Sequence, residues 1–176
     1  FQDEERRINI TGIHKGNYKI LMQLFTLLNI EEGKAEALAA QIVDWQDADS
    51  EKTNPPYGAE KDDYLALPKP YPCKDRPLES LEELLLIKDM TPEIFLKIKD
   101  YVTVFPQNNT LSINVNTAPA VVLKSLFRFM AKESPGVEAE DADSLTEKII
   151  AYRKGEDAVA CTADDRAINN TNIGSL

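Results

Sequence analysis

The feature that most constrains this chain is a pattern that occurs twice: a short β-prone segment, a leucine-rich helical segment, a polar loop and an alanine-led helical segment. In the first copy residues 7–11 (RINIT) precede the helical pair, which ends in Asp44-Trp45. In the second copy residues 112–117 (SINVNT) precede a pair that ends in Tyr152-Arg153. Two such helix pairs with short strands predict an α+β chain that is mostly helical.

Helical periodicity supports the first pair. Apolar residues recur there at the three- and four-residue spacing of one helix face, which predicts helices over about 17–29 and from about residue 34 to the acidic stretch that starts at Asp44. The residues of these faces are Leu21, Leu24, Phe25 and Leu28, then Ala35, Leu38, Ala39 and Ile42.

Further helix starts are marked by polar residues and a proline. Residues 80–83 and 144–147 both have the Ser-x-x-Glu form of a capping box, in which two side chains satisfy free amides at a helix start. In Thr91-Pro92-Glu93 the proline stands where a helix needs no amide donor. We expect helices to begin at these three places and at residues 116–119 (NTAP).

Two β-rich segments flank the turn at 106–109 (PQNN). Residues 101–105 (YVTVF) and 111–115 (LSINV) are rich in β-branched, aromatic and alternating apolar residues. This arrangement predicts an antiparallel hairpin.

The charge of the chain limits its functions. A net charge of −10 repels phosphate backbones and anionic membrane surfaces, so nucleic acid is a poor partner. The helix pairs also permit a second hypothesis, a helix-hairpin-helix module that binds nucleic acid, but their turns lack the glycine-bearing hairpin that holds phosphates. His14 is the only histidine and no nucleophile motif accompanies it, so we expect no enzyme.

The acidic stretch at 44–64 (DWQDADSEKTNPPYGAEKDDY) has two interpretations. It can be a solvated loop, as charge runs often are. It can instead bind calcium, which takes six to eight oxygen ligands and holds like charges together, with Gly58 allowing the chain to bend back. The stretch is not an EF-hand. The candidate ligands are Asp44, Asp47, Asp49, Glu60 and Asp63.

The cysteines leave one question open. Cys73 and Cys161 are too few for a thiolate zinc cluster. They can form a disulfide in an oxidising compartment or stay as two unrelated buried thiols.

Five segments in order resemble the general secretion pathway protein K family, the large minor pseudopilins of the bacterial type II secretion system. These segments are RINI, IVDWQDAD, YGAEKDDY, LESLEELLLIKDMT and SINVNTAP, and the resemblance covers roughly residues 3–155.

The resemblance implies a SAM-like or helix-hairpin-helix-like helical domain over 12–100, inserted in a truncated pilin-like part formed by 1–11 and 101–176 with a small antiparallel sheet. It implies a structural subunit at the pseudopilus tip that supports protein export and assembles with minor pseudopilins resembling proteins I and J. It implies a periplasmic location, with an inner-membrane anchor only through an N-terminal helix absent from this sequence. It also implies calcium at Asp44, Asp47, Asp49 and Glu60.

Overall fold

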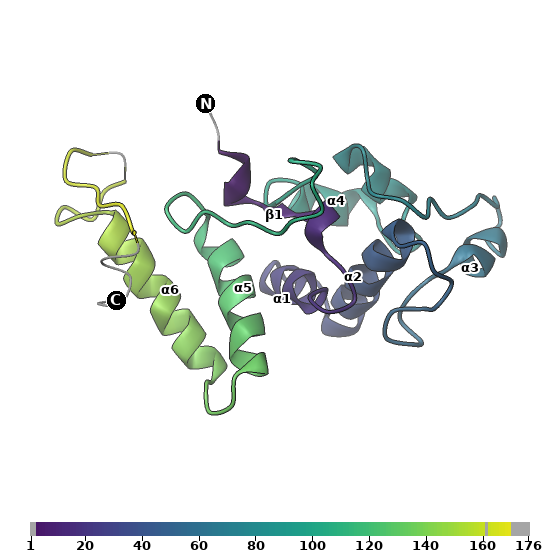
Figure 1. The fold of residues 1–176 in the computed structure, drawn as a ribbon, viewed down its shortest axis with the longest axis horizontal. Coiled ribbons are helices and arrows are strands. Elements are labelled where there is room, and N and C mark those ends of the chain that lie inside the picture. Colours follow the sequence, from purple (N-terminus) through teal and green to yellow (C-terminus); the bar gives the residue numbers. More distant parts are fainter. Residues whose placement is uncertain (1–2, 161, 170–176) are drawn as a thin grey trace.

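The computed structural model describes residues 3–160 and 162–169 and is mostly helical with one small sheet (Figure 1). This confirms the α+β, mostly helical prediction. The α-helices are α1 (Lys19–Leu27), α2 (Glu32–Gln46), α3 (Lys61–Leu65), α4 (Pro92–Ile98), α5 (Ala120–Glu133) and α6 (Ala139–Arg153). The short 3₁₀ helices are η1 (Glu4–Arg6), η2 (Ile10–Gly12) and η3 (Leu81–Leu86), and the strands are β1 (Ile8–Asn9) and β2 (Val102–Thr103).

The two helix pairs of the repeated pattern are both present. Helix α1 packs on α2, α5 packs on α6, and α5 also packs on α1, which joins the pairs. Leu21, Leu24 and Phe25 on α1 are fully buried, as their spacing predicted. Burial of such side chains stabilises a fold by about 1.5–3 kcal/mol each, so these faces fix how the pairs meet.

The predicted antiparallel hairpin is wrong. Strand β2 pairs in parallel with β1, Ile8 opposite Val102 and Asn9 opposite Thr103, and residues 111–115 form no strand. The buried Asn9 side chain donates to the carbonyls of Pro106 (2.7 Å) and Thr110 (3.3 Å), which draws the 106–110 turn towards the first segment. Strand β2 thus pairs with β1, and the Asn9 side chain binds the 106–110 turn. These two contacts form in place of the predicted pairing between 101–105 and 111–115.

A close backbone contact holds the same region. A Cβ added at Gly12 would lie 2.5 Å from backbone atoms of Thr110 and of Leu111. Only a glycine lets the two segments approach this closely. The partner of the 110–111 segment is therefore the chain around η2 rather than residues 101–105.

The predicted helix starts are confirmed at three places and wrong at one. Helix α5 begins at Ala120, directly after the predicted residues 116–119. Ser80 and Glu83 form the capping box of η3, and Thr91 accepts a hydrogen bond from the Ile94 amide at the start of α4. Helix α6, however, begins at Ala139, so Ser144 lies inside it. Its capping box uses Glu138 and Asp141 instead, where acidic side chains also meet the positive end of the helix dipole.

The hydrophobic core is continuous across the predicted domain boundaries. Buried side chains of β1, α1, α2, α4, β2 and α5 belong to one cluster. The division into residues 12–100, against 1–11 and 101–176, stays a prediction. Within the described ranges no helix has the length and hydrophobicity needed to cross a bilayer.

Candidate metal centre

The C-terminal end of α2 is anchored in the core. Trp45 is 3% exposed and packs edge-on against Tyr64, with ring centroids 5.0 Å apart, and against Tyr71 at 6.3 Å. Trp45 is therefore a core residue. The aromatic cluster fixes the point from which the acidic chain departs.

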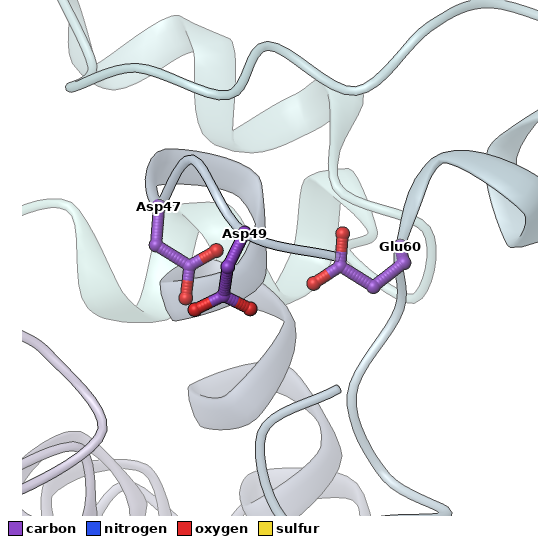
Figure 2. Close-up of side chains that lie close together, drawn as sticks. All are labelled: Asp47, Asp49 and Glu60. Carbon is purple, nitrogen blue, oxygen red and sulfur yellow. The ribbon is translucent and has the colours of Figure 1, made fainter. Parts of the chain in front are cut away.

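Three carboxylates converge beside this anchor. Asp47 is the C-cap residue directly after α2, Asp49 follows two residues later, and Glu60 directly precedes α3. One carboxylate oxygen of each lies within 4.8 Å of those of the other two. Figure 2 shows Asp47 and Asp49 side by side with the Glu60 side chain extending towards them from another segment. Loop closure thus brings together acids that are eleven to thirteen residues apart.

Several oxygens of this acidic region are buried without a hydrogen bond. Among the described residues no hydrogen bond reaches either Asp47 carboxylate oxygen, Glu60 Oε1 or Asp44 Oδ2, although the Lys15 ammonium lies 3.5 Å from Asp47 Oδ2. Burying such a group without a partner is costly, most of all when it is charged. A hard divalent cation would supply such a partner, since calcium takes clustered carboxylate oxygens. The residues present therefore fit a calcium ion.

Burial and mutual repulsion shift the pKa of the acids. Burial, followed by the charges of Asp44, Asp47 and Asp49, raises the pKa of Glu60 to about 7. Burial also raises the pKa of Asp47, against the opposing charge of Lys15. Without a cation the site thus favours a proton on Glu60 near neutral pH.

Asp44 has a structural role in the same region. It is fully buried, and its Oδ1 accepts a hydrogen bond of 2.8 Å from the Thr53 amide. Burial raises its pKa, and the Thr53 hydrogen bonds offset part of that effect. A Cβ at Gly58 would lie 2.1 Å from Asp44 Oδ2, so only a glycine lets the loop close over this carboxylate.

The Lys15 side chain places a positively charged ammonium group beside the acidic cluster. Its Nζ lies 2.8 Å from both Asp49 carboxylate oxygens and 3.5 Å from Asp47 Oδ2. The hydrogen bond from Lys15 lowers the pKa of Asp49. A cleft of about 400 Å³, lined by His14, Lys15, Asp47 and Asp49 among others, leads to this point. Sequence reasoning missed Lys15, since its distance of 34 residues from Asp49 gives no local signal.

The fifth predicted ligand lies outside the cluster. Asp63 Oδ2 accepts from the Glu60 amide at 2.9 Å, and its Oδ1 pairs with Lys52 at 2.8 Å and Lys88 at 3.7 Å. Although burial raises its pKa, these bonds and charges lower it overall. The structure therefore brings together Asp47, Asp49 and Glu60. Asp44 is buried in the core at the base of this group, and Asp63 caps the start of α3.

One of the two cysteines of the possible disulfide lies outside the residues that the structure describes. Cys73 is buried, and its Sγ lies 3.5 Å from the carbonyl oxygen of Asp44. Burial raises the pKa of this thiol to about 12. Cys161 lies outside the described residues, so the pairing stays a prediction.

Comparison with known proteins identifies what this chain is similar to. Residues 6–107, which include the acidic cluster, match the family model described as type II secretion system (T2SS), protein K. Type II secretion system protein K of Pectobacterium carotovorum subsp. carotovorum is 32% identical over 127 residues, 65% of this chain and 38% of that protein. The protein of the same name from Pseudomonas aeruginosa is 27% identical over 132 residues, 72% of this chain and 38% of that protein. This chain thus spans well under half of these relatives.

A solved structure shares the fold. It is the crystal structure of the GspK-GspI-GspJ complex from the type 2 secretion system of enterotoxigenic Escherichia coli, one chain of which matches with a TM-score of 0.65. The match has 21% identity and covers 82% of this chain and 61% of that one. At 21% sequence identity this match shows a shared fold alone.

Proposed function

Because the chain belongs to the family of type II secretion system protein K, we propose that it is a structural, non-catalytic part of a minor pseudopilin at the tip of the secretion pseudopilus. The observation that carries this proposal is the family match over residues 6–107. The shared fold supports it. Since the chain spans 38% of the first two relatives, the role in protein export belongs to the whole protein.

The proposed partners are minor pseudopilins of the I and J classes. The matched solved complex contains GspK, GspI and GspJ. We propose that the whole protein lies in the periplasm, held at the inner membrane by an N-terminal helix. The SAM-like character of the helical part and the pilin-like character of the rest belong to the same proposal.

Retention of the partners tests this role. The immobilised chain should retain the periplasmic domains of an I-class and a J-class pseudopilin from the same organism, and a major pseudopilin domain is the matched control. Failure to retain either minor pseudopilin would contradict the proposal. The alternative, a nucleic-acid-binding module, predicts a gel shift at low salt, because phosphate contacts bind most strongly there.

We further propose that calcium binds at Asp47, Asp49 and Glu60, with Asp44 at the base of the site. The support is the set of buried carboxylate oxygens without hydrogen bonds and their approach to within 4.8 Å. Calcium would neutralise the clustered negative charge there. The chain's own residues hold the loop in the conformation that binds the ion. Asp44 holds the Thr53 amide, and Trp45 anchors the helix end.

Direct titration with calcium tests the site. Asp47→Asn should weaken calcium binding at least tenfold, because it removes an anionic ligand. Asp62→Asn is the matched control, since this exposed residue has the same charge and lies outside the cluster. Equal losses in both variants would show a general charge effect and contradict the site.

A further inference from the structure

The ammonium group of Lys15 lies among the oxygens of residues 47–51 as a small cation would. Its Nζ is 2.8 Å from both Asp49 carboxylate oxygens, 2.9 Å from the Glu51 carbonyl oxygen and 3.5 Å from Asp47 Oδ2. Carboxylate and backbone carbonyl oxygens are also the ligands that calcium takes in proteins. The lysine is therefore bound by the same kind of oxygens as a hard cation, and two of its partners belong to the three-carboxylate cluster.

Asp49 has little capacity for a metal ion while Lys15 is bound to it. Its Oδ1 accepts from the Lys15 ammonium and also from the Glu51 amide at 2.8 Å, which uses both lone pairs of that oxygen. Its Oδ2 accepts from Lys15 as well. A divalent cation on the same carboxylate would also repel the ammonium, because like charges interact strongly at short range. Binding of calcium at Asp49 thus requires the Lys15 ammonium to leave.

The turn that carries Lys15 does not depend on this contact for its shape. The His14 amide donates to Asn17 Oδ1 at 2.8 Å, and Asn17 Nδ2 donates to the Gly12 carbonyl at 3.1 Å. The Tyr18 amide donates to the His14 carbonyl at 3.0 Å. None of these three bonds involves the Lys15 side chain, so its release leaves the turn intact.

There is also space for the lysine to leave. The Lys15 side chain is 39% exposed and lines the cleft of about 400 Å³ beside the acidic cluster. The ammonium can therefore rotate from the carboxylates into this cleft and be solvated there. Its hydrogen bond to Asp49, joined by the negative charges of Asp47 and Asp49, raises the pKa of Lys15 against the effect of burial. The group that leaves is thus a charged ammonium.

We propose that Lys15 is an exchangeable internal cation, which occupies the Asp47 and Asp49 side of the cluster in the metal-free chain and is displaced into the adjoining cleft by calcium. This inference rests on the calcium site proposed above and adds what one side chain of the protein does when the ion binds. Before calcium binds, Lys15 holds residues 47–51 against the turn at 13–17. Calcium binding then frees a positive charge at the rim of the cleft.

NMR of the lysine ammonium groups tests the exchange on the unaltered chain, in chelator and during a calcium titration. An ammonium group held by carboxylates exchanges its protons with water slowly enough to give a signal. The Lys15 signal, identified by its absence from Lys15→Met, should be present in chelator. It should be lost in proportion to the bound calcium, which calorimetry measures on the same sample.

Lys52 is the matched control within the same chain. Its Nζ also lies 2.8 Å from a carboxylate oxygen, that of Asp63, and its side chain is 37% exposed. Asp63 is outside the group of Asp47, Asp49 and Glu60. The Lys52 signal, identified with Lys52→Met, should therefore persist throughout the calcium titration.

Four outcomes would overturn the proposal. Calcium binding with an unchanged Lys15 signal would overturn the exchange and leave the calcium site standing. Absence of calcium binding in the calorimeter would overturn the site and the exchange together. Absence of the Lys15 signal in chelator, with the Lys52 signal present, would show that Lys15 does not hold the carboxylates. Equal loss of both signals with calcium would indicate a general change in the acidic stretch.

Discussion

At the scale of single residues, Glu60 links the acidic cluster to pH. Its pKa of about 7 in the folded chain exceeds the ordinary value of 4.5. Between these values the folded state binds more protons than the unfolded state, so the free energy of unfolding falls as pH rises. In chelator this decrease should reach at most about 3 kcal/mol between pH 5 and 8.

Glu60→Gln tests this coupling by urea denaturation across that pH range. The variant should lose most of the decrease, because glutamine does not titrate. Calcium should also remove the decrease from the unaltered chain, since it favours the ionised carboxylate. An unchanged pH profile in the variant would assign the effect to other groups.

Lys15 should stabilise the chain when metal is absent and weaken calcium binding when metal is present. In chelator, Lys15→Met removes the partner of Asp47 and Asp49 and should lower the free energy of unfolding by about 1 kcal/mol. With calcium, the variant should bind several-fold more tightly because the ammonium no longer competes. Thermal melts in chelator and calcium titrations measure the two effects, and weaker calcium binding in the variant would show that Lys15 supports the site.

Gly58 is required for steric reasons. A side chain there would meet Asp44 Oδ2 at 2.1 Å and Thr53 backbone atoms at 2.7–2.8 Å. Gly58→Ala should therefore lower the free energy of unfolding by about 2–4 kcal/mol, as overpacking of a closed site does.

Gly136→Ala is the control for this substitution. Gly136 has a φ of +81° and no atom within 4 Å of an added Cβ. Backbone strain alone should cost about 1 kcal/mol there. Equal losses in the two variants, measured by urea denaturation, would show that close packing over Asp44 is not what Gly58 provides.

At the scale of elements, local patterns predicted helices better than strand partners. Periodicity predicted α1 and α2, and the Thr91-Pro92 pair predicted the start of α4, because each depends on neighbouring residues. The parallel pairing of β1 with β2 depends on residues 94 positions apart, such as Ile8 and Val102. A single sequence does not specify such a distant partner, so the prediction of a hairpin with the nearer segment 111–115 is wrong.

Helix α6 gives a direct test of the corrected cap. Asp141→Ala should lower the free energy of unfolding by about 0.5–1 kcal/mol, because it removes the acceptor of the Glu138 amide at 3.0 Å. Ser144→Ala should be neutral or slightly stabilising, since alanine is the better residue inside a helix. The reverse order in urea denaturation would restore the sequence prediction for the start of this helix.

The candidate site shows the same limit of sequence reasoning. Clustering of like charge predicted the region, and the structure brings together Asp47, Asp49 and Glu60 from the predicted set. Sequence spacing did not separate these from Asp63, whose contacts with Lys52 and Lys88 depend on tertiary structure.

At the scale of the whole molecule, the acidic cluster connects the long helix α2 to the irregular chain that follows it. Asp47 and Asp49 lie on one side of the loop and Glu60 on the other. A cation between them would tie these parts together and remove the repulsion among buried acids. The central claim is that such a cation gives the acidic stretch of this protein K family member a structural role.

Thermal unfolding in chelator, in millimolar magnesium and in millimolar calcium tests this claim most directly, with metal content checked after dialysis. Calcium at about a hundred times its dissociation constant should add about 2.7 kcal/mol and raise Tm by roughly 5–10 °C. Magnesium should have little effect, because it demands near-ideal octahedral geometry and releases its water reluctantly. Identical melting curves in all three buffers would contradict the account and leave the acidic stretch as a solvated loop.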